Sequence, residues 1–213
     1  TIASPEPVLT SDGRRQLVYE LQLINRTQSV ATVKSLRALA AGKVVQSLAG
    51  QALLEQMAPY GQPQHSLSLK PGQGAYVLMD VSLPAKAKVP AQLTHRISVG
   101  LKPAQAGVAT SYELAPTRVS RREAVVVAPP LRGPGWVVGN GCCANFNAHR
   151  GTVLPVNGAA HVAERFAIDF VQLNSQNRLF EGSRDRLMDY PYYGDQVYSA
   201  TAGKVVGVVD DVP

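Results

Sequence analysis

Apolar and polar residues alternate in three stretches of the first half of the chain. Odd-numbered positions are apolar in 17–23 and again in 75–83, and the alternation recurs in 97–101. A period of two is that of a half-buried β-strand. Residues typical of turns separate the stretches, namely Asn25-Arg26-Thr27, Pro59-Tyr60-Gly61, Pro71-Gly72 and Lys102-Pro103. The sequence therefore predicts an all-β fold that begins with an antiparallel, immunoglobulin-like β-sandwich, with helix only near 47–57.

Proline and glycine concentrate in residues 129–136, where the alternation stops. We interpret this segment as a linker between a β-sandwich domain, residues 1–128, and a second domain, residues 137–213. Acidic residues such as Glu20 and Asp80 are scattered through the first domain, and no motif connects them. The first domain is therefore interpreted as a scaffold without chemistry of its own.

The second domain contains two predicted hairpins. Residues 152–156 and 159–162 flank Asn157-Gly158, a pair strongly favoured in two-residue hairpin turns. A second hairpin is expected within residues 194–209, where Ala202-Gly203-Lys204 connects residues 194–200 to the valine-rich run 205–209.

The second arm of the first hairpin is expected to continue as one strand over residues 164–171. Alternation along that strand would place Phe166, Ile168 and Phe170 on one packed face. Asp169 would then lie on the opposite face, where an ion could reach its carboxylate.

Charge and composition narrow the classes of partner. The formal net charge is +6 and the pI is about 9.5, which favours anionic partners. Only 6% of residues are aromatic and there is no basic block, so nucleic-acid binding is not expected. No apolar run is long enough for a membrane-spanning segment. Because the chain starts at Thr1 without a leader, we expect a periplasmic or extracellular protein whose leader has been removed.

Two segments of the second domain resemble a known family. Arg165-Phe166-Ala167-Ile168-Asp169-Phe170 and the stretch 193–206 are similar to the start of the catalytic domain of lysostaphin/LytM-type zinc endopeptidases. Residues 136–150 resemble a subgroup of that family with an N-terminal β-sandwich. The resemblance implies a cell-envelope metallopeptidase that cuts peptidoglycan cross-links, with Asp169 as a zinc ligand. It also implies that residues 137–213 are the first part of a LytM-like peptidase domain, whose His-x-His motif and catalytic histidines would follow Pro213.

One position departs from the pattern of the family. Its first zinc ligand is a histidine four residues before the aspartate, and this chain has Arg165 there. Arginine does not ligate zinc, because its guanidinium stays protonated. His149 is the favoured replacement, by resemblance to the subgroup, and His161 is the less favoured one. The alternative role for Asp169 is a salt bridge with Arg165 or another basic residue.

Two further features have competing interpretations. The adjacent Cys142 and Cys143 are interpreted as structural rather than catalytic, because no base stands at motif spacing. The aromatic residues of 190–194 could line a groove for peptide or glycan, but anchoring of loops is favoured. The alternative to a peptidase is a non-catalytic envelope binding or scaffold protein with a degenerate peptidase-like domain, for which Arg165 is the main argument.

Overall fold

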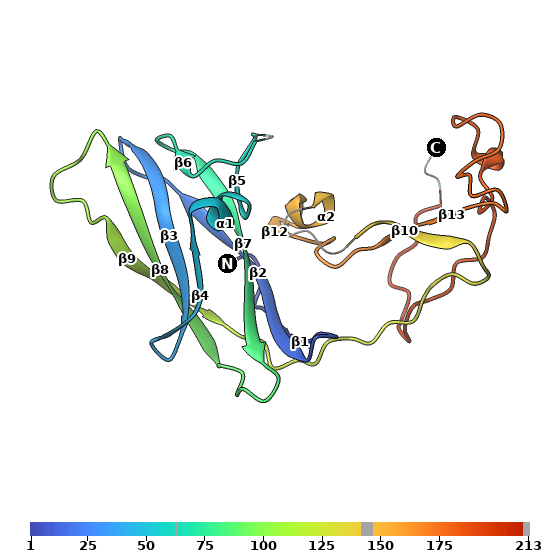
Figure 1. Ribbon diagram of the computed structural model, residues 1–213, viewed down its shortest axis with the longest axis horizontal. Helices are drawn as coiled ribbons and strands as arrows, with labels where there is room; N and C mark the ends of the chain where they lie inside the picture. Colours follow the sequence, from blue (N-terminus) through green and yellow to red (C-terminus); the bar gives the residue numbers. More distant parts are fainter. Residues whose placement is uncertain (63, 142–146, 211–213) are drawn as a thin grey trace. The chain divides into compact units, whose positions relative to one another are not determined.

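The computed structural model describes residues 1–62, 64–141 and 147–210, and for Ala115 the backbone alone. The fold is all-β with antiparallel sheets, as predicted (Figure 1). Contacts group the chain into two compact units. The first combines residues 1–124 with 142–167, and the second combines 125–141 with 168–213. The predicted linker 129–136 thus falls inside the second unit, and the segment with His149 and Arg165 belongs with the sandwich.

Two sheets form the sandwich of the first unit. One has the strand order β1-β2-β7-β5, and the other has the order β4-β3-β8-β9 with β6 paired to β3. The strands are β1 (Pro7–Leu9), β2 (Arg14–Ile24), β3 (Val30–Ala40), β4 (Lys43–Ala49), β5 (Met57–Pro59), β6 (Ser68–Leu69), β7 (Gly74–Pro84), β8 (Gln92–Lys102) and β9 (Ser111–Arg118). A short helix, α1 (Gly50–Leu54), lies within the predicted helical stretch.

The core lies between the two sheets and follows the predicted alternation. The odd-numbered residues 17–23 of β2 and 75–83 of β7 are buried and pack against buried residues of β3 and β8 in one apolar cluster. The strands β2 and β7 pair over eleven residues in an unbroken antiparallel register. Their even-numbered side chains therefore face the outer side of this sheet.

The predicted hairpin at Asn157-Gly158 is confirmed. Strand β11 (Leu154–Val156) pairs with β12 (Ala159–His161), and Asn157 and Gly158 both have positive φ, 48° and 78°. Positive φ at both central residues is what a type I′ turn requires.

The strand predicted over residues 164–171 is wrong in its first half. The backbone turns there instead, with Arg165 N donating to Val162 O and Ala167 N to Glu164 O. A strand begins only at Asp169, as β13 (Asp169–Gln172), and it pairs with β10 (Trp136–Asn140) in the second unit. The predicted packed face is also wrong, because Phe166 and Ile168 are 66% and 49% exposed.

The hairpin predicted within residues 194–209 is wrong as well, because the structure has no strand there. Tyr198 N donates to Pro130 O and Ala128 N donates to Ala200 O, so this part of the chain bonds to the proline-rich segment instead. A 3-10 turn, η1 (Leu187–Asp189), lies in the sequence between Phe180 and Tyr190, whose rings contact each other, and the ring of Tyr190 also contacts that of Tyr192. These contacts agree with the loop-anchoring interpretation of 190–194.

Candidate functional site

His149 lies in a single helical turn that asparagine caps. The turn is α2 (Ala148–Gly151), and the side-chain Oδ1 of Asn147 accepts the hydrogen of Arg150 N at 2.9 Å. Asparagine is a preferred N-cap residue because its side chain satisfies an amide that the helix leaves without a partner. His149 is therefore not on a ladder of the hairpin, and it is 7% exposed.

The imidazole of His149 contacts the backbone that leads to Asp169. Its Nδ1 lies 3.0 Å from the carbonyl oxygen of Ala167. A carbonyl oxygen can only accept, so Nδ1 carries the hydrogen and donates it. In the neutral ring Nε2 then holds the lone pair, which is the form in which imidazole ligates a metal. The ring of His149 thus contacts Ala167, which is two residues before Asp169 in the sequence.

Asp169 and His161 are both exposed. Asp169 starts β13, where it pairs with Asn140, and belongs to the second compact unit. His161 ends β12, paired with Leu154 on the exposed hairpin. Of the two candidate histidines, His149 is thus the one whose ring is held against the motif.

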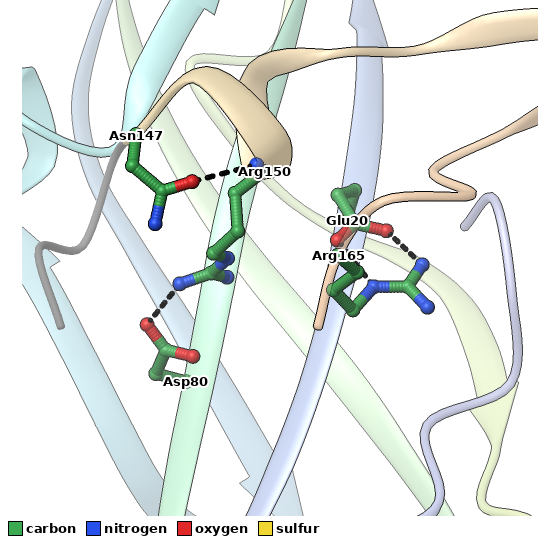
Figure 2. A network of polar contacts seen from close by, with 5 residues as sticks. All are labelled: Glu20, Asp80, Asn147, Arg150 and Arg165. Atoms are coloured by element: carbon green, nitrogen blue, oxygen red, sulfur yellow. Dashed lines mark hydrogen bonds and ion pairs between the residues drawn. The ribbon is translucent and has the colours of Figure 1, made fainter. Parts of the chain in front are cut away.

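Arg165 forms an ion pair with the sandwich rather than with Asp169. Its Nε and Nη2 bind the two carboxylate oxygens of Glu20 on β2, at 2.8 and 2.5 Å (Figure 2). The Glu20 side chain is fully buried and that of Arg165 is 15% exposed. A two-point contact between a guanidinium and a carboxylate is the strongest geometry of this kind of pair. This contact gives Arg165 a structural role.

A second ion pair binds the same segment to the neighbouring strand. Arg150 Nη1 lies 2.8 Å from Asp80 Oδ2 on β7, and the two side chains are 9% and 26% exposed. Figure 2 shows both pairs on the same side of β2 and β7. Neither acid can be recognised from local patterns, because their partners are 145 and 70 residues away in the sequence.

A second candidate surface lies at the edge of the sandwich. A cavity of about 790 Å³ is lined in part by the apolar residues Val8, Leu9 and Val119. Four cationic residues and one acid also line it, namely Arg15, Lys88, Arg121, Arg122 and Glu123. This excess of positive charge suits an anionic ligand.

The described residues were searched for metal-binding groups and for membrane-spanning helices. Within residues 1–62, 64–141 and 147–210, no three His, Cys, Asp or Glu side chains gather as a metal site. Cys142 and Cys143 lie outside the described residues. No helix in the described part of the chain is long and apolar enough to cross a membrane.

Comparisons with known proteins give no assignment. No family model matches the chain, and neither the curated proteins nor the solved structures yield a match.

Proposed function

We propose that the chain belongs to a zinc metalloendopeptidase of the bacterial cell envelope, periplasmic or extracellular, that acts on peptidoglycan cross-links. The contact between His149 Nδ1 and Ala167 O carries this proposal. It fixes the imidazole in the tautomer of a zinc ligand and places it against the segment that resembles the metal-binding motif of LytM-type enzymes.

Two residues of this chain would hold the zinc. The Nε2 of His149 and the carboxylate of Asp169 are both ordinary zinc ligands. Bound zinc would polarise the scissile carbonyl and lower the pKa of an attacking water. A catalytic zinc site uses three protein ligands, so the proposal requires a third from outside this pair. A His-x-His motif further along the reading frame would supply it.

The test measures zinc in protein expressed from the full reading frame. We expect about one zinc per chain in the parent, and loss of most of it in Asp169→Asn and in His149→Gln. The matched controls are Asp185→Asn, which changes an aspartate that is 89% exposed in the second unit, and His161→Gln. Both controls should retain zinc. A zinc-free parent, or equal zinc in Asp169→Asn, would reject the proposal, and zinc lost only from His161→Gln would reassign the ligand.

The second candidate function is a non-catalytic envelope binding module. Arg165 favours it, because the residue at the zinc-ligand position already forms a buried ion pair with Glu20. The basic cavity would then bind an anionic cell-wall polymer. This function predicts a zinc-free parent whose binding to anionic wall polymer weakens in Arg121→Gln/Arg122→Gln. Zinc in the parent and unchanged binding in that variant would reject it.

A further inference from the structure

Glu20 and Asp80 are diagonal neighbours on the outer face of the β1-β2-β7-β5 sheet. Val18 is directly opposite Asp80 and Glu20 is directly opposite Leu78, so the two acids are two positions apart across the β2–β7 ladder. Side chains at such diagonal positions are close enough to interact. Two carboxylates there repel each other unless cations neutralise them.

The outer face is covered at this place. Glu20 is fully buried although it points away from the core between the sheets. Leu78, which faces the same side, is only 1% exposed. In the segment 147–167, His149, Arg150 and Val162 are also buried. Water is therefore largely excluded around the ion pairs, which strengthens them and makes their geometry more restrictive.

The two arginines stand on either side of the His149–Ala167 contact. Arg150 follows His149 directly, and Arg165 precedes Ala167 by two residues. Each arginine binds a different strand of one continuous ladder. The donor side and the acceptor side of the His149 hydrogen bond are thus both attached to the sandwich, as Figure 2 shows for the two ion pairs.

We propose that Glu20 and Asp80 are positioning residues for His149. The sandwich is then part of the histidine site, because its outer sheet face sets where the imidazole and the Ala167 carbonyl meet. One ion pair would leave the segment free to pivot, whereas two pairs on neighbouring strands fix its position and orientation. The zinc part of this inference rests on the proposed function, while the positioning of the imidazole does not.

The first arm of the test needs no metal and uses the 213-residue chain. Long-range ¹H–¹⁵N NMR of the imidazoles reports which nitrogen of His149 carries the hydrogen, and hydrogen exchange reports the protection of residues 147–167. In Glu20→Gln and in Asp80→Asn we expect the Nδ1–H tautomer to be lost or mixed. Amide exchange in the segment should rise tenfold or more, with β3 and β8 unchanged. The control is Glu113→Gln, which removes the exposed Arg96–Glu113 pair on the other sheet.

The second arm measures zinc affinity in protein from the full reading frame. Loss of a group that orients a ligand typically weakens metal binding 10- to 100-fold, and we expect this range for Glu20→Gln. A zinc-free parent with an altered tautomer in Glu20→Gln would reject the peptidase and support positioning. An unchanged tautomer and unchanged exchange in both variants would overturn the positioning role. Equal zinc affinity in parent and variants would overturn the zinc part of the inference. If Glu20→Gln fails to fold, Asp80→Asn decides, because the Asp80 side chain is already 26% exposed.

Discussion

Arg165 and Glu20 form an ion pair whose burial decides what each residue contributes to stability. The bidentate ion pair between them is buried on the acid side and nearly buried on the arginine side. Removing one partner of such a pair is costly because a charge remains without compensation in a place that water scarcely reaches. Replacing both partners by apolar residues is much less costly.

The first prediction at the residue scale is an asymmetry between the two partners. Arg165→Met should lower the free energy of unfolding by about 3–5 kcal/mol, because it leaves the fully buried Glu20 carboxylate unpaired. Glu20→Gln should cost less, roughly 2 kcal/mol, because the amide oxygen still accepts and Arg165 keeps some contact with water. The double variant Glu20→Leu/Arg165→Met should recover most of the loss. Urea unfolding measures all three.

Glu113→Gln is the control for this series. It removes the Arg96–Glu113 pair, whose side chains are 48% and 55% exposed, so the cost should stay below about 1 kcal/mol. Equal losses in Arg165→Met and Glu113→Gln would show that the Arg165–Glu20 pair is not buried in solution.

A second prediction concerns the histidine in the core of the sandwich. His95 Nε2 and Tyr19 Oη lie 2.7 Å apart between the two sheets, and both residues are fully buried. Burial lowers the pKa of His95 to about 4, with a smaller effect from the N-terminal ammonium group. The unfolded chain binds the proton near pH 6.5, so stability is complete above that pH and falls as the pH drops towards 4.

This loss should be on the order of 3 kcal/mol between pH 7 and pH 4. In His95→Gln the pH dependence over this range should shrink by that amount, although the variant is less stable at pH 7. Unfolding curves at pH 7, 5.5 and 4 measure the difference, and comparison with the parent removes the contribution of the carboxylates. Parallel pH profiles for parent and variant would contradict a buried neutral His95.

At the scale of elements, the sequence predicts those strands whose buried face or turn is encoded in neighbouring residues. The alternation of 17–23, 75–83 and 97–101 corresponds to β2, β7 and β8, and the Asn157-Gly158 turn to β11 and β12. In the three alternating stretches, the apolar side chains indicate which face of the strand is buried. The sandwich was therefore predictable.

Two elements were predicted wrongly because distant contacts override local alternation. Residues 164–167 have the pattern of a strand, yet they form a turn, and the side chain of Arg165 binds Glu20 there. Residues 194–209 have the pattern of a hairpin, yet Tyr198 and Ala200 bond to the segment around Pro130. Neither partner can be inferred from periodicity.

The residues of the candidate site also fall into those that a local motif indicates and those that it does not. His149 and Asp169 were proposed as ligands from a motif, and this role stays a prediction; the structure shows only that His149 Nδ1 contacts Ala167 O. Glu20 and Asp80 were missed. The sequence signal for a covered outer face is Leu78, because an outer face open to water usually has polar residues at the even positions of β7. It indicates that the face is covered, but not by which residues.

At the scale of the whole chain, two divisions into domains differ in where they assign the segment 147–167. Sequence patterns favour a cut at 129–136, with everything after it as a separate domain. Contacts in the structure place 142–167 with residues 1–124. The two descriptions differ in what happens when the chain is cut between Val126 and Val127, which are 89% and 64% exposed.

The last prediction is that the two halves of a chain cut there stay together. A specific protease site inserted between Val126 and Val127 allows a single cleavage, after which residues 147–167 should hold the second fragment on the sandwich through the two buried ion pairs. Size-exclusion chromatography of the cut parent should give one peak that contains both fragments. In Glu20→Gln/Asp80→Asn the fragments should separate, because the outer sheet face then offers no charge to either arginine. Two peaks from the cut parent would favour an independent second domain over residues 137–213. One peak from both proteins would show that apolar contacts, such as those of the buried Val162, hold the segment without the ion pairs.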